Sequence, residues 1–382
     1  MSGTSTVFKK IIFFDYLRAI AILFIAFYHY VLEVTLFHIR PSVELSYPQN
    51  LQLLEVFPSN AEYSALGNLL VFLASQGYQF VGVFIFISGF GLTYSRLGKA
   101  PKCWQWGRRI IKLLPQFQIA IIFAFIVNYI SIHFLRQYLI AAPTLAAYPY
   151  LRLLLYPFVW FDFYALISSV NPSLWFSGLI LQFYLVYDAF YLLLMKVKPW
   201  VFLILALGIT LIYRYITLFW YKGDPFLFSL LPVRLFEFAL GMAAAYVYVM
   251  NGYDLFYRIK WWVGGLAGFL IWYVGFRLGY TEYGRIVNDL LTTIGLMILG
   301  TIVFRNISKG WIAVVLGAIG VQSYWIYLLH NQLITQFLTP WTFMQWDKTG
   351  MSGLVLLSGF GIIVGIALLF SILMNRRKKV LL

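Results

Sequence analysis

The chain has 382 residues, of which 62% are hydrophobic, 20% are aromatic and only 11% are charged. Soluble proteins carry about 25% charged residues, so the composition excludes a soluble protein and predicts an all-α polytopic membrane protein. The formal net charge of +15 then reflects membrane topology and contact with membrane lipids, and we expect no binding to nucleic acid.

About ten apolar segments are long enough to cross a bilayer as helices. We expect them to form a single transmembrane domain over residues 1–382, with no cleavable signal peptide and no appended soluble domain. Of the 28 Lys and Arg residues, 18 lie at the termini or after even-numbered segments, and eight lie in or beside the other connections. The positive-inside rule therefore predicts cytoplasmic termini for a protein of the cell membrane. The segments lie near residues 11–34, 75–95, 110–134, 173–195, 199–218, 226–249, 262–279, 287–304, 315–338 and 352–374.

Four ionisable residues lie in the first apolar segment, where charge is costly. At 100° per residue, Arg18 and His29 fall within about 20° of one another. Asp15 and Glu33 lie within about 60° of that pair. Such a stripe must face the protein interior or a wet cavity, so it marks a candidate functional site. A structural ion pair would account for Asp15 and Arg18, but not for the other two residues.

Small residues interrupt the second apolar segment. They allow close packing of helices, which is the simpler interpretation of the pattern. The same gaps would also admit a slender acyl or pantetheine chain. The small residues are Gly77, Gly82, Ser88, Gly89 and Gly91.

The connection after the second segment is strongly basic, and Arg108, Arg109 and Lys112 lie at its end. Arg18 lies about 16 Å nearer the cytoplasm than His29, at 1.5 Å rise per residue. Arginine suits phosphate recognition, so these four residues are candidates for an inner basic mouth that binds an anionic ligand. For the residues of the connection, membrane topology alone is the alternative explanation.

The outer half of the membrane holds a second set of candidates. Arg234 and Glu237 are neighbours at i and i+3 and can pair. Arg234 and His330 both lie in the outer halves of their segments, as His29 does. We therefore expect these three residues to converge in one outer pocket, although a histidine in such a segment can also be a packed and satisfied core residue.

Six short motifs lie in order along nearly the whole chain. They are Asp15-Tyr16-Leu17-Arg18-Ala19-Ile20-Ala21 with His29; Gly82-Val83 through Ser88-Gly89-Phe90; Arg108-Arg109 with Leu114-Pro115; Leu174-Trp175 with Gln182-Phe183-Tyr184; Arg234 with Glu237-Phe238 and Gly241; and Gly320 with Ser323-Tyr324 and Tyr327-Leu328-Leu329-His330. Together they resemble the motifs of the acyltransferase-3 family of integral membrane acyltransferases. Lys112 stands where that family commonly has an arginine. Ile180 stands where a large branch has a glutamate, which leaves the acceptor open.

The resemblance implies an O-acyltransferase that moves an acyl group, usually acetyl, from cytoplasmic acyl-CoA to a sugar hydroxyl of a cell-surface or exported glycan. The expected partners are a surface polysaccharide or lipid-linked saccharide acceptor, membrane lipids and glycan-assembly proteins. The expected cofactor is acyl-CoA as donor substrate, without a metal. The alternative is a transporter of glycans or lipid-linked intermediates that performs no acyl transfer, with the polar stripe lining its pathway.

In this interpretation His29 is the general base, because an unperturbed histidine pKa near 6.5 suits the task. Glu33, one turn further on, would fix the tautomer of His29. Arg234 or His330 would stabilise the oxyanion. A covalent intermediate on a serine or a histidine stays open. The residues expected to bind acyl-CoA are Arg18, Ser88, Arg108, Arg109 and Lys112.

Overall fold

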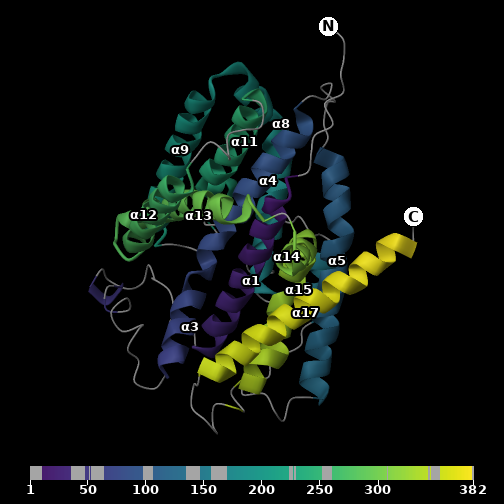
Figure 1. Cartoon of the computed structure of the whole chain (residues 1–382). Coiled ribbons are helices and arrows are strands. Elements are labelled where there is room, and N and C mark those ends of the chain that lie inside the picture. Colours follow the sequence, from purple (N-terminus) through teal and green to yellow (C-terminus); the bar gives the residue numbers. More distant parts are fainter. Residues whose placement is uncertain are drawn as a thin grey trace. The chain divides into compact units, whose positions relative to one another are not determined.

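The described part of the chain is all-α, as predicted (Figure 1). The structure is a computed structural model, and it describes residues 11–35, 48–50, 52, 64–97, 106–134, 147–155, 170–222, 227, 229–251, 260–307, 309–342, 345 and 353–380. The α-helices are α1 (Phe13–Val34), α3 (Ala65–Ser75), α4 (Phe80–Arg96), α5 (Trp106–Phe134), α6 (Ala147–Leu155), α8 (Trp175–Lys196), α9 (Pro199–Tyr215), α11 (Leu235–Met250), α12 (Trp261–Gly279), α13 (Asn288–Phe304), α14 (Trp311–Val321), α15 (Ser323–Leu333) and α17 (Gly353–Val380).

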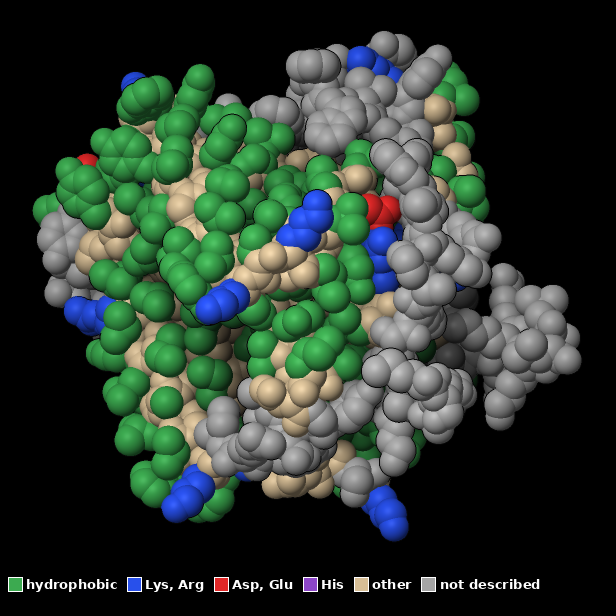
Figure 2. Space-filling view, turned by 90° about the horizontal axis from the view of Figure 1, so that it is seen from above, with side chains coloured by type: hydrophobic (Ala, Val, Ile, Leu, Met, Phe, Trp, Pro, Cys, Tyr) green, Lys and Arg blue, Asp and Glu red, His purple; other side chains and the backbone are tan. Residues whose placement is uncertain are grey.

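Eight helices among the described residues are long and apolar enough to cross a membrane. Figure 2 shows hydrophobic side chains over much of the described surface in its view. The predicted segment at 75–95 begins earlier than expected, because α3, η2 (Gly77–Gln79) and α4 form one apolar stretch, Ala65–Arg96. The predicted segment at 287–304 is the shorter helix α13. The orientation of the termini stays a prediction.

The predicted segment at 315–338 is broken into two helical pieces rather than continuous. It consists of α14 and the stretch Ser323–Thr342, which are bent by 76° relative to each other. The bend occurs at Gln322, between Gly320 and Ser323, and glycine and serine are common at sharp kinks. Beyond α15 the chain continues as a π-helix, η8 (Ile334–Leu338).

The helices divide into two compact units. The first unit comprises residues 1–18, 79–109 and 179–317. Within it, α4 packs against α11 and α12 packs against α13. A Cβ atom on Gly89 would clash with the backbone oxygen of Phe238, and one on Gly241 would clash with that of Phe86. The packing interpretation of the small residues is therefore confirmed at Gly89, where only glycine permits this approach of α4 and α11.

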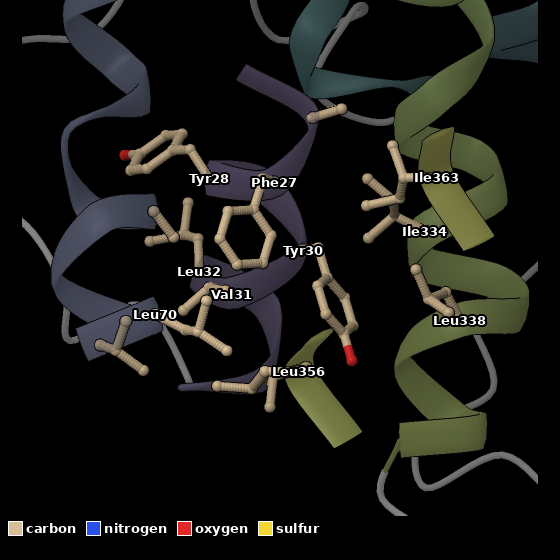
Figure 3. Packing of buried hydrophobic residues seen from close by; sticks show 14 residues of the cluster. Phe27, Tyr28, Tyr30, Val31, Leu32, Leu70, Ile334, Leu338, Leu356 and Ile363 are labelled. Carbon is tan, nitrogen blue, oxygen red and sulfur yellow. The ribbon is translucent and has the colours of Figure 1, made fainter. Parts of the chain in front are cut away.

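The second unit comprises residues 19–78, 110–178 and 318–382. Its core gathers side chains from the later part of α1, from α3, from η8 and from α17 (Figure 3). At its centre the hydroxyl of Tyr30 contacts Thr342 Oγ1 at 2.7 Å. This core fixes the half of α1 that carries His29 and Glu33. Most of two long connections between apolar segments, residues 38–65 and 135–172, lies outside the described residues.

Candidate active site

The second unit brings His29 of α1 and His330 of α15 into direct contact. Nδ1 of His29 lies 2.8 Å from Nε2 of His330, and the two rings are stacked with centroids 5.0 Å apart. The Nδ1 atom of His330 lies 2.7 Å from the backbone oxygen of Tyr327. His330 is buried and His29 is half-buried. Two titratable rings thus form a chain of hydrogen bonds that ends on a backbone carbonyl.

Polar side chains hold α15 in place beside residues 170–177. Asn171 caps η4 (Pro172–Leu174) by accepting from the Ser173 amide at 3.0 Å, as the Asn-Pro-Ser sequence indicates. The same side-chain oxygen accepts from Asn331 Nδ2 at 3.2 Å. The hydroxyl of Tyr327 donates to the Ser173 carbonyl, and Gln332 donates to the Val170 carbonyl. These bonds fix the rotation of α15 and thereby the position of His330.

An apolar cavity of about 50 Å³ lies on one side of His330. Its wall includes Ile326, Leu329 and Leu333 of α15 together with residues of η8 and α17. Apart from His330, this lining offers no polar side chain. The ring of His330 therefore finds its polar partners at His29 and Tyr327 and faces hydrocarbon elsewhere.

Glu33 lies one turn beyond His29 and is half-buried. In the structure, Nδ1 of His29 contacts Nε2 of His330. The tautomer-fixing role of Glu33 stays a prediction, and the observed geometry offers another residue for that role.

A second group of polar residues lies in the first unit, along one face of α8. Tyr184, Tyr187, Asp188 and Tyr191 are spaced so that they share this face. Asp188 forms an ion pair with Arg96 of α4, whose guanidinium carbon lies 4.2 Å from the ring centroid of Tyr191. Cations over aromatic rings are attracted by the ring quadrupole. The face therefore binds one arginine tightly.

Arg109, at the start of α5, lies over the same face. Its guanidinium carbon lies 5.3 Å from the ring centroid of Tyr187 and 5.9 Å from that of Tyr184. Its Nη1 atom is buried and has no hydrogen-bond partner among the described residues. Tyr184 interacts electrostatically with Arg18 as well as with Arg109. We call this set the cation–tyrosine cluster: Arg18, Arg96, Arg109, Tyr184, Tyr187, Asp188 and Tyr191.

The remaining predicted donor-binding residues have different surroundings. Arg18 forms the predicted ion pair with Asp15, at 3.0 Å, and its side chain is 35% exposed. Ser88 is half-buried and donates to the Phe84 carbonyl within its own helix. Lys112 is exposed. Arg108 belongs to α5, but its side chain lies outside the described part of the structure.

Arg234 takes part in a buried ionic network within the first unit. Its Nη1 atom lies 2.6 Å from Asp289 Oδ2 and 3.3 Å from Glu237 Oε1, so the predicted pairing with Glu237 is confirmed. Arg214 is fully buried and contacts the same Glu237 oxygen at 2.7 Å. Two guanidinium groups thus meet two carboxylates. Arg234 lies in a different unit from the two histidines, and its convergence with them stays a prediction.

Sequence reasoning missed several residues of these sites. Arg214 interrupts an apolar run, and an intramembrane arginine is a signal of function or of a buried partner. The tyrosines of α8 carried a signal in their spacing at three and four residues, opposite a basic connection. The missed residues are Arg96, Tyr187, Asp188, Tyr191, Arg214 and Asp289.

Within the described ranges, no three His, Cys, Asp or Glu side chains lie close enough together to hold a metal ion. The family model of the Acyl_transf_3 acyltransferase domain matches residues 11–376, which is nearly the whole chain. Neither the curated proteins nor the solved structures contain a match.

Proposed function

The chain belongs to the acyltransferase-3 family and is an integral membrane acyltransferase, and from this premise we propose its substrates and mechanism. We propose that it resides in the cell membrane. There it transfers an acyl group, most simply acetyl, from cytoplasmic acyl-CoA to a sugar hydroxyl of a cell-surface or exported glycan. The observation that carries the proposal is the contact between His29 and His330 within a domain of this family. Acyl transfer to a hydroxyl needs a general base, and a histidine is the side chain best suited to that role near neutral pH.

The proposed reaction is a direct displacement. His29 removes the proton from the acceptor hydroxyl while the hydroxyl oxygen attacks the thioester carbonyl carbon. The carbon–sulfur bond then breaks, and the CoA sulfur leaves with the proton that His29 had taken. The products are an ester of the glycan and free CoA, and the histidine returns to its starting state.

The cation–tyrosine cluster supports an anionic donor. Guanidinium groups bind phosphate through charge-assisted hydrogen bonds, and aromatic faces stack on the bases of nucleotides. The buried Nη1 atom of Arg109 has no hydrogen-bond partner among the residues that the structure describes, so it can donate to a phosphate oxygen.

Transfer is tested in inverted membrane vesicles from cells that express the chain, supplied with radiolabelled acetyl-CoA. We expect label to enter the glycan fraction as an alkali-labile ester. His29→Ala should lower the rate by about 10²- to 10⁴-fold, the usual contribution of a general base. His133→Ala is the matched control, because His133 is an exposed histidine of α5.

Two outcomes would contradict the proposal. One is the absence of labelled ester with the wild-type chain and an authentic acceptor. The other is a folded His29→Ala variant, with a wild-type melting profile in detergent, that transfers acetyl as fast as His133→Ala.

A further inference from the structure

We propose that His330 is a positioning residue that sets the tautomer of His29. The two rings form a chain of hydrogen bonds whose fixed end is the backbone carbonyl of Tyr327. The inference rests on the proposed function for its role in acyl transfer, although the hydrogen-bond chain itself stands on geometry. In this arrangement a second histidine, His330, takes the place of the carboxylate that orients the catalytic histidine in a Ser-His-Asp triad.

The first step starts from the carbonyl. A backbone oxygen can only accept a hydrogen bond. Because Nδ1 of His330 lies 2.7 Å from the Tyr327 oxygen, that nitrogen must carry the proton. A neutral imidazole has one N–H group, so Nε2 of a neutral His330 is an acceptor.

The second step transfers this constraint to His29. Nε2 of His330 lies 2.8 Å from Nδ1 of His29. An acceptor at that distance requires a donor, so Nδ1 of His29 carries its proton. A neutral His29 then has its lone pair on Nε2, which becomes the basic atom.

The third step concerns how firmly the hydrogen-bond chain from Tyr327 to His29 is held in place. Tyr327 is tied through its hydroxyl to the Ser173 carbonyl, and Asn331 is tied to Asn171. His330 is 5% exposed and faces an apolar cavity on one side. The carbonyl and the ring therefore cannot exchange these partners for water, and the tautomer of His29 is set before any substrate binds.

This assignment changes the role that the sequence gave to His330. A neutral His330 uses Nδ1 to donate to Tyr327 and Nε2 to accept from His29, so it has no donor left for an oxyanion. When His29 takes a proton on Nε2, its Nδ1–H group still donates to His330. The imidazolium that forms is thus stabilised by a hydrogen bond already in place.

Nitrogen-15 NMR of the full chain in detergent, with labelled histidine, tests the tautomer directly. The chain has four histidines, and His38→Gln and His133→Gln variants assign the other two signals. We expect neutral wild-type His29 to carry its proton on Nδ1. We expect His330→Phe, which removes the acceptor, to return His29 to a mixture of tautomers.

Kinetics test the consequence. His330→Phe should lower kcat by about 10²- to 10⁴-fold, the range for a base held in the wrong tautomer, with KM for acetyl-CoA unchanged. His330→Gln should restore much of both the tautomer and the rate, because its amide oxygen can accept from His29 where Nε2 of His330 does.

A wild-type His29 protonated on Nε2 would overturn the inference, and so would a His330→Phe variant with wild-type tautomer and kcat. An absence of acetyl transfer in all samples would overturn the proposed function alone, because the NMR measurement reports the hydrogen-bond chain without any substrate.

Discussion

Substitution of Arg214 by methionine tests whether the ionic network of the first unit holds that unit together. Arg214 of α9 is fully buried. Its guanidinium contacts Glu237 Oε1 at 2.7 Å and the carbonyls of Val233 and Ile286 at 2.9 and 3.2 Å. A methionine keeps the length of the side chain and much of its volume but removes every one of these bonds.

The expected loss in the free energy of unfolding depends on the charges that remain once Arg214 is removed. Glu237 keeps Arg234 at 3.3 Å, but Arg234 also pairs with Asp289, so two carboxylates then share one guanidinium. Breaking a buried ion pair costs roughly 3–5 kcal/mol, which is on the order of a hundred- to several thousandfold in the unfolding equilibrium. Arg277→Met, at an exposed arginine of α12, should cost less than about 0.5 kcal/mol.

A double variant separates the ion pair from simple loss of packing. Arg214→Met with Glu237→Leu removes one positive and one negative charge and leaves Arg234 with Asp289. Replacing a buried pair by apolar residues of similar volume is often neutral or stabilising, so the double variant should recover most of the lost stability. Unfolding by denaturant in mixed micelles, followed by tryptophan fluorescence, measures all three. The reasoning is refuted if Arg214→Met unfolds at the same denaturant concentration as Arg277→Met.

Two further predictions concern the donor and the topology. Arg109→Ala should weaken CoA binding by about ten- to a hundredfold, the value of one charge-assisted hydrogen bond, as measured by calorimetry; equal weakening in Arg277→Ala would contradict a specific contact. The topology is tested in a Cys103→Ser background with an impermeant thiol reagent added to intact cells. The reagent should label Tyr283→Cys but not Lys198→Cys, both at exposed positions. The reverse pattern would show that the predicted orientation is wrong.

The features that the sequence predicted well depend on local spacing. Hydropathy alone located the apolar helices, because a lipid-facing helix must be apolar over its whole length. The ion pairs of Arg18 with Asp15 and of Arg234 with Glu237 join residues three apart in the sequence, which a helix or the start of a helix brings together. These interactions require only that the helix forms.

Contacts between distant segments were harder to predict. Depth in the membrane suggested that His29 and His330 meet, but depth gives no rotation about the helix axis. The contact of His29 with His330 depends on the bend at Gln322 and on the bonds that hold α15. The pairing of Arg214 with Asp289 and Glu237 likewise depends on how three helices pack, which spacing within one helix does not determine.

Charge balance distinguishes the two arginine groups of the first unit. In the buried network, two guanidinium groups meet two carboxylates among the described residues, so these four charges balance. The oxyanion role of Arg234 stays a prediction. Around the cation–tyrosine cluster, three arginines meet two carboxylates, which leaves one positive charge, and Arg109 Nη1 has no partner in the described part of the chain. A buried excess charge is costly unless an anion compensates it. The neutral network therefore suits a structural role, whereas the cluster suits a phosphate-bearing donor. The charges counted are those of Arg18, Arg96, Arg109 and Asp188 of the cluster and of Asp15, the ion-pair partner of Arg18.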